Sequence, residues 1–254
     1  MKFAALMVAL AGIASGASAA VSFTGTTYTQ NFDSLANSGT ANTWTADTTL
    51  PGWYARRTLA AAGEWATYRA DNTNTGAIYS FGATASTERA FGSVSSGTPG
   101  TITFAVVLQN NTSGILNAFD LSFVGEQWRN GGNTAAQTLA FDYKTVATFV
   151  AAEVDSAATG YTALPALNFV SPVVGATAAV LDGNLPANQA NLSVTGTSVA
   201  WNPGEFLILR WTDINDGGND HSLAIDNVTF NAIPTPGAMA LLGLAGLVAG
   251  RRKR

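Results

Sequence analysis

The chain has 254 residues, of which 11% are charged, and a formal net charge of -4. This balance excludes a nucleic-acid-binding protein, which needs clustered Lys and Arg to displace counterions from phosphates. The chain has no cysteine, which excludes a disulfide framework and thiolate chemistry. Six Trp, six Tyr and 13 Phe argue against intrinsic disorder, because their burial offsets the entropy lost on ordering.

The first 20 residues predict a signal peptide. Lys2 supplies a positive start, residues 3–13 form an apolar run, and residues 17–19 read small-x-small, as Ala-Ser-Ala. We expect residues 1–20 to form a signal helix that is cleaved after Ala19 or Ala20 during export.

Residues 21–232 predict one all-β domain. Apolar and polar residues alternate in short segments separated by Asn- and Gly-rich turns, as expected for half-buried strands. These segments are residues 77–81, 101–108, 119–123, 139–143, 206–211 and 223–230. Many short strands at this spacing indicate an antiparallel β-sandwich of jelly-roll type. The segment around residues 28–32 is expected to pair with the last strand and close the fold.

Two aromatic segments are candidates for a ligand-binding face. Trp53, Tyr54 and Arg56 follow a Pro-Gly turn, where loops commonly carry function. Trp128 follows a strong strand segment, and two interpretations of it stay open. Its ring either stacks on a sugar while neighbouring polar groups bind hydroxyls, or it lies in the core and Glu126 pairs with Arg129 or Arg210.

The densest polar stretch, residues 210–221, contains Asp213, Asp216 and Asp220. Carboxylate and amide oxygens are the hard ligands that calcium prefers, so these residues are candidate metal ligands. The alternative is a hairpin loop whose Asp and Asn side chains bond to their own backbone.

The sequence contains no convincing catalytic centre. His221 is the only histidine, and no Gly-x-Ser-x-Gly segment is present. A glycosidase needs two carboxylates about 5–10 Å apart, and Glu126 with Asp213 is the pair considered for that role.

Residues 223–228 read Leu-Ala-Ile-Asp-Asn-Val. They resemble the closing strand of jelly-roll carbohydrate-binding modules and MAM-like adhesion domains, often written Ile-Asp-Asp-Val. The resemblance implies a structural calcium ion held by Asp226 together with an acidic residue of the opening strand, which by position is Asp33.

Residues 233–254 form a three-part tail. Pro234, Thr235 and Pro236 are followed by an uncharged run over residues 238–250, which is expected to form a short apolar helix outside the domain, and the chain closes with the basic residues Arg251, Arg252, Lys253 and Arg254. The run is shorter than the roughly 20 residues that span a bilayer comfortably, and the basic end is expected to stay cytoplasmic. The tail resembles the PEP-CTERM sorting signal, with Thr235 where that family has Glu. This resemblance implies transient anchoring in the inner membrane and processing by an exosortase.

Taken together, the sequence predicts an exported protein of the cell surface or extracellular matrix. Its sandwich is expected to be non-catalytic, to hold calcium and to bind polysaccharide or neighbouring surface components. A carbohydrate-active hydrolase and a purely structural surface protein are the alternatives.

Overall fold

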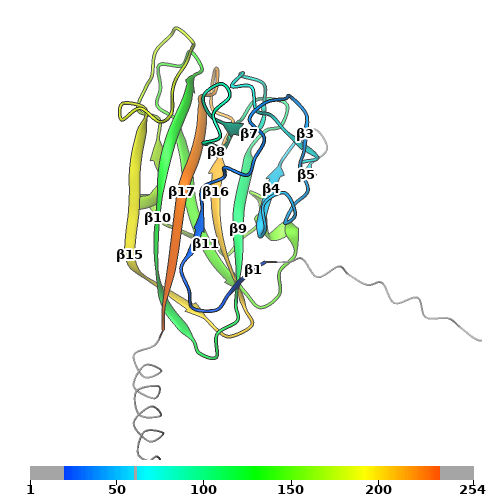
Figure 1. Ribbon diagram of the computed structural model, residues 1–254, viewed down its shortest axis with the longest axis vertical. Coiled ribbons are helices and arrows are strands. Elements are labelled where there is room, and N and C mark those ends of the chain that lie inside the picture. The colour runs from blue at the N-terminus through cyan, green and yellow to red at the C-terminus, as the bar shows by residue number, and fades with distance from the viewer. Residues whose placement is uncertain (1–19, 60–61, 235–254) are drawn as a thin grey trace, which may run out of the picture.

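The computed structural model describes residues 20–59 and 62–234, which form two packed β-sheets (Figure 1). This confirms the antiparallel sandwich of jelly-roll type. The expected signal peptide (residues 1–19) and the tail from Thr235 onward lie outside the described residues, so the sorting motif is represented here only by Pro234. No helix in the described part of the chain has the length and apolarity that crossing a membrane requires.

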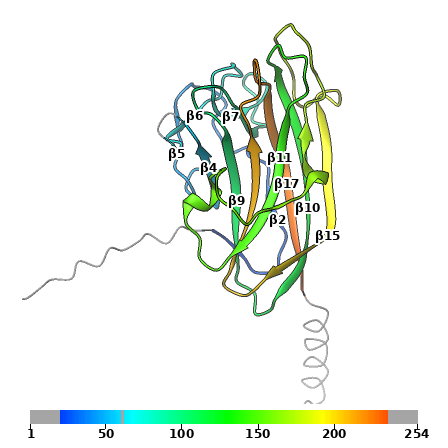
Figure 2. The same ribbon diagram turned by 180° about the vertical axis from the view of Figure 1, so that it is seen from behind.

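One sheet, which we call sheet A, has the strand order β12-β11-β16-β9-β4-β5, with β1 beside β9 and β13 beside β11. Figure 2 shows β11, β9, β4 and β5 of this sheet following one another across the view. All its pairs are antiparallel except β1 with β9. Its strands are β1 (Val21–Phe23), β4 (Trp53–Arg57), β5 (Gly63–Glu64), β9 (Ile102–Asn110), β11 (Thr138–Val146), β12 (Thr162–Ala163), β13 (Phe169–Val170) and β16 (Phe206–Asp213).

The second sheet, sheet B, has the order β14-β10-β17-β8-β7, with β15 beside β10 and β2 beside β17. Its strands are β2 (Tyr28–Gln30), β7 (Ala77–Phe81), β8 (Ala90–Val94), β10 (Leu116–Asn130), β14 (Ala179–Val180), β15 (Gln189–Trp201) and β17 (Ser222–Pro234). Tyr28 lies opposite Phe230, so the opening strand pairs with the last one as the sequence predicts.

The remaining elements are short. β3 (Asn42–Thr43) and β6 (Thr67–Tyr68) form a separate two-stranded sheet, and η1 (Ala151–Val154) and η2 (Pro165–Leu167) are single 3-10 turns.

The core fills the space between the two sheets with large aromatic side chains. Trp53 stacks on Trp211, which also stacks on Phe104, at centroid distances of 5.7 and 6.0 Å. Phe91 of sheet B packs edge-on against Phe104 of sheet A, at 5.2 Å. Because side chains alternate across a strand, the residues between these core positions point to the outer faces of the sheets. The outer face of sheet B carries the candidate site.

Candidate metal centre

The aromatic residues expected on a ligand-binding face lie inside the protein. Trp53 is completely buried and Tyr54 is 2% exposed, so the expectation of an exposed aromatic face is wrong. The physical reason is that residues 53–57 form β4, an internal strand of sheet A whose Trp53 lies opposite Val106 of β9. Tyr54 points the other way and packs against Phe149, at a centroid distance of 4.9 Å.

Arg56 and Trp128 also have internal partners. The Arg56 guanidinium pairs with Asp155, with Nε 2.6 Å from Oδ1, and lies 3.6 Å from a carboxylate oxygen of Glu64. Trp128 is 1% exposed, and its Nε1 donates a hydrogen bond to Glu126 Oε2 at 2.9 Å. Trp128 therefore lies in the interior and has no free face for a sugar. In the described residues no aromatic side chain is fully exposed, and only Tyr28, Tyr143, Tyr161 and Phe206 are partly exposed.

The polar loop between β16 and β17 does not gather its three aspartates around one point. Asp213 is buried and accepts hydrogen bonds from Ser93 Oγ (2.6 Å) and the Ser95 backbone N–H (3.2 Å). Asp220 accepts a hydrogen bond from the Asp216 backbone N–H at 2.9 Å. This bond is the one expected of a hairpin loop whose side chains bond to their own backbone. Within the described residues, these aspartates belong to no group of acidic or histidine ligands close enough to share an ion.

His221 belongs to the same loop and is fully buried. Its Nδ1 accepts a hydrogen bond from the Gly131 backbone N–H at 2.9 Å, and burial lowers the pKa of the imidazole. The histidine therefore connects two loops and keeps its ring neutral.

Glu126 of sheet B points away from the space between the sheets, whereas Asp213 of sheet A points into it. Ser93 bonds to Asp213 between the sheets, and the ladder places Ser93 opposite Leu223 and Leu223 opposite Gln127. Gln127 therefore faces inward and Glu126, one residue earlier, faces outward. The carboxylate pair considered for a hydrolase is not assembled.

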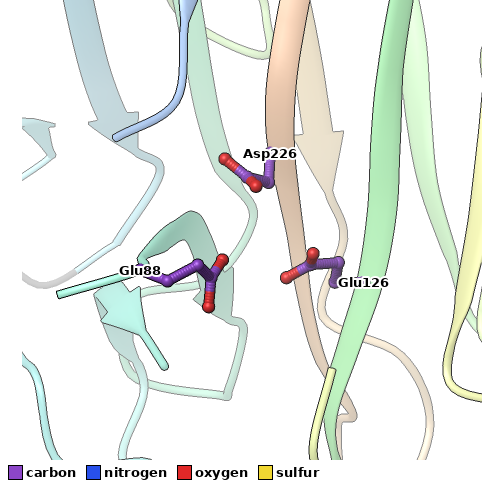
Figure 3. A group of neighbouring side chains, drawn as sticks. All are labelled: Glu88, Glu126 and Asp226. Atoms are coloured by element: carbon purple, nitrogen blue, oxygen red, sulfur yellow. The ribbon is translucent and has the colours of Figure 1, made fainter. Parts of the chain in front are cut away.

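A different set of carboxylates converges on the outer face of sheet B. One oxygen each of Glu88, Glu126 and Asp226 lies within 4.8 Å of the others. Figure 3 shows the three side chains turned toward a common point from three separate segments: β10, β17 and the turn before β8. We call these three residues the carboxylate centre. Of the predicted metal ligands it contains Asp226.

A β-bulge in β17 positions Asp226. Ser122 and Val124 on β10 are two residues apart, whereas their partners Thr229 and Asp226 are three apart, so β17 carries one extra residue here. Asn227 absorbs the bulge with a positive φ of 52°. Beyond this point β17 exchanges its neighbour β8 for β2, so three strands meet beside the centre.

Each carboxylate is held through one of its oxygens by an N–H donor. Glu126 Oε2 accepts from Trp128, Asp226 Oδ2 accepts from Asn227 Nδ2 at 2.6 Å, and Glu88 Oε2 accepts from Asn184 Nδ2 at 2.5 Å. The other oxygens of Asp226 and Glu88 are buried and have no hydrogen-bond partner. Buried polar atoms are almost always paired, so two orphaned oxygens at one point indicate a ligand.

The electrostatics of the centre agree with this interpretation. Burial raises the pKa of Glu126 to about 8, opposed by the Trp128 hydrogen bond and reinforced by the negative charges of Asp226, Glu88 and Asp182. Burial likewise raises the pKa of Asp226 to about 7, opposed by Asn227 and reinforced by Glu88 and Asp33. Without a cation, burial and, secondarily, the neighbouring negative charges favour the protonated forms of Glu126 and Asp226.

Asp33, the partner implied by the resemblance, lies close by but is occupied. Its Oδ1 accepts a hydrogen bond from the Arg89 backbone N–H at 3.0 Å, and its Oδ2 accepts from Asn31 Nδ2 at 2.7 Å. Asp33 therefore supports the turn that carries Glu88 and is absent from the converging group.

The donor set suits a hard divalent cation. All three groups are carboxylates, with no imidazole or thiolate, which favours calcium over zinc. Three carboxylates fixed by N–H donors also match the outer hydrogen bonds that orient metal ligands. The residues present thus fit a calcium ion, which would offset two of the three carboxylate charges and would link β10, β17 and the turn before β8.

Comparisons with known proteins describe only general similarity. The sequence matches no protein-family model and no curated protein. Among solved structures, the enzymatically active domain of bacteriophage CBA120 tailspike protein 4 shares 13% identity over 72% of this chain and 19% of its own, with a TM-score of 0.36. TmCBM61 in complex with beta-1,4-galactotriose shares 9% identity over 59% of this chain and 74% of its own, with a TM-score of 0.27.

Proposed function

We propose that this is a calcium-binding, non-catalytic sandwich protein exported to the cell surface or extracellular matrix, where it contacts polysaccharide or neighbouring surface components. The observation that carries the calcium part is the convergence of Glu88, Glu126 and Asp226 with two orphaned buried oxygens. The export part rests on the predicted signal peptide and on the tail, whose expected partners are an exosortase and, before processing, the inner membrane.

A structural role for the ion is favoured over a catalytic role for the carboxylates. Glu126 and Asp226 are 2% and 3% exposed, so a polymer cannot reach them without movement of the covering loops. Glycosidase carboxylates must flank the scissile bond of a bound sugar. The same burial suits an ion that stabilises the domain.

Two measurements test the proposal on the chain lacking residues 1–20. Calorimetric titration with CaCl2, with MgCl2 as the comparison, is expected to show one saturable calcium site. Retention on insoluble polysaccharides, with calcium present, is expected for at least one of them. Absence of calcium binding overturns the calcium part, and absence of retention on every polysaccharide overturns the polysaccharide contact.

A further inference from the structure

A polar groove lies next to the carboxylate centre on the outer face of sheet B. It has a volume of about 320 Å³ and is formed by β2 and the bulged part of β17. Its lining consists of Thr29, Gln30, Asn31, Asn227, Val228 and Thr229. This volume is at the lower end of the range for small-molecule sites.

The strand ladder explains why the groove is hydrophilic. Tyr28 pairs with Phe230, and Phe230 packs in the core, so the next pair, Thr29 with Thr229, faces outward. Thr27 continues the outward row and donates a hydrogen bond to Asn231 at 2.6 Å. Neighbouring strands thus present hydroxyl and amide groups side by side.

The chemistry of this lining selects a neutral, hydroxyl-rich ligand. None of its six residues is charged, and each threonine hydroxyl or amide group offers both a donor and an acceptor. A charged ligand would find no opposite charge in the groove, and an aromatic ligand would find no aromatic ring. Within the described chain, the hydroxyls of Thr29 and Thr229 have no protein partner.

Asn227 connects the groove to the carboxylate centre. Its Nδ2 donates to Asp226 Oδ2, its side chain is exposed toward the groove, and its backbone holds the positive φ of the bulge. The hydrogen bond from Nδ2 to Asp226 Oδ2 therefore couples the orientation of this groove residue to that of Asp226. Fixing Asp226 therefore fixes a groove residue.

We propose that this groove binds the hydroxyl groups of an uncharged polysaccharide, and that a cation at the carboxylate centre strengthens this binding by fixing Asn227. The proposal rests on the proposed function and assigns its polysaccharide contact to one place. By linkage, calcium and polysaccharide increase each other's affinity by the same factor, and coupling of this kind is commonly about fivefold or more.

Affinity electrophoresis in gels containing a β-glucan, a galactomannan or the polyuronate alginate tests the proposal, with CaCl2 or EDTA. The double variant Thr29→Val/Thr229→Val removes two hydroxyls while keeping β-branched side chains. Thr195→Val, an exposed position of β15 in the same sheet, is the matched control. Asn227→Gly keeps the positive φ accessible and removes the amide.

We expect a neutral polysaccharide to retard the protein, and the double threonine variant to bind it at least about fivefold more weakly, while Thr195→Val binds normally. Calcium should strengthen binding of the wild type and not of Asn227→Gly. Retention that survives the double variant overturns the groove while leaving polysaccharide binding intact. Preference for alginate overturns the neutral ligand class. Failure of every gel to retard the protein removes the polysaccharide part of the proposed function and the groove with it, and a calcium titration then shows whether the cation part stands.

Discussion

Chelation of calcium is expected to destabilise the protein, and replacement of Asp226 by Asn is expected to remove that effect. The wild type brings three carboxylates to within 4.8 Å of one another, so an ion that binds only the folded state must raise the free energy of unfolding. In the same position the amide of Asn keeps the shape of the side chain and removes one charged ligand.

The size of the effect follows from mass action. Extracellular calcium modules bind with dissociation constants of about 10⁻⁴–10⁻³ M, so about 10 mM CaCl2 is roughly 10–100 times the dissociation constant. This concentration adds about 1.4–2.7 kcal/mol to the free energy of unfolding. For a domain of this length, Tm should therefore rise by about 3–11 °C.

Differential scanning calorimetry in EDTA and in CaCl2 measures this shift. Asp226→Asn should show no shift, and in EDTA it should melt at or above the wild type, because a neutral amide replaces a carboxyl group whose charged form is disfavoured by burial and by its neighbours. Asp216→Asn, whose carboxylate lies in the β16–β17 loop, is the control and should keep the full shift. An equal Tm of the wild type in both buffers, or a calcium shift that persists in Asp226→Asn, would refute the assignment.

Three further changes probe the surroundings of the site and the core. Gly183→Ala places a Cβ about 2.4 Å from the Trp128 indole, so urea unfolding should show a free energy of unfolding lower by about 1–3 kcal/mol. The control Gly217→Ala has open space around it, and its free energy of unfolding should stay within about 0.5 kcal/mol of the wild type. Burial raises the pKa of Asp213 to about 7, so the folded state binds more protons than the unfolded state between about pH 4 and 7. The free energy of unfolding of the wild type, relative to Asp213→Asn, should fall as pH rises through that window, by up to about 1.4 kcal/mol per pH unit, and parallel pH profiles would contradict this. Arg210→Ala breaks the buried two-point ion pair with the Asp142 carboxylate and removes the stacking of the guanidinium on Tyr161. The free energy of unfolding should therefore fall by about 3–5 kcal/mol, and residues 147–163 should become more sensitive to proteolysis.

Much of the fold could be predicted because apolar and polar residues alternate wherever one face of a strand packs on the core. β7 matches the predicted segment 77–81, β10, β11, β16 and β17 contain theirs, and β9 begins one residue after the predicted start of segment 101–108. β15 is harder to recognise from sequence, because a bulge shifts its inward phase: Leu192 and Val194 face inward before Gly196, and Val199 and Trp201 face inward after it. The sequence of β15 therefore shows two short alternating segments and no single continuous alternation.

β4 shows why loop chemistry misled the assignment of Trp53 and Tyr54. A Pro-Gly pair marks the turn correctly, but the aromatic residues that follow it belong to a strand with both faces covered. One face packs on the opposite sheet, and the other packs beneath Phe149 and Val154, which come from a segment almost a hundred residues later. No local sequence pattern indicates that this second face of β4 is buried.

Only Asp226 of the carboxylate centre could be predicted from sequence, because one short motif points to it. The resemblance lies in the closing strand, which contains Asp226. Glu88 and Glu126 lie 38 residues apart in the chain, in segments that share no sequence motif. Their meeting depends on the strand order β10-β17-β8, which the sequence does not reveal. The dense loop carrying Asp213, Asp216 and Asp220 drew attention by composition, yet its side chains bond to local backbone and to buried serines.

The departure of this chain from the Ile-Asp-Asp-Val pattern has a physical reason in the structure. Asn227 donates an N–H to Asp226 Oδ2, which an Asp at that position could not do, and an Asp would bring a fourth negative charge to the three already converging there. Asn also tolerates the positive φ that the bulge requires better than most residues. The amide binds Oδ2 of Asp226, and Oδ1 of Asp226 stays buried without a hydrogen-bond partner. Asn227 accordingly lies between the carboxylate centre and the polar groove, and we expect the state of each to depend on the other.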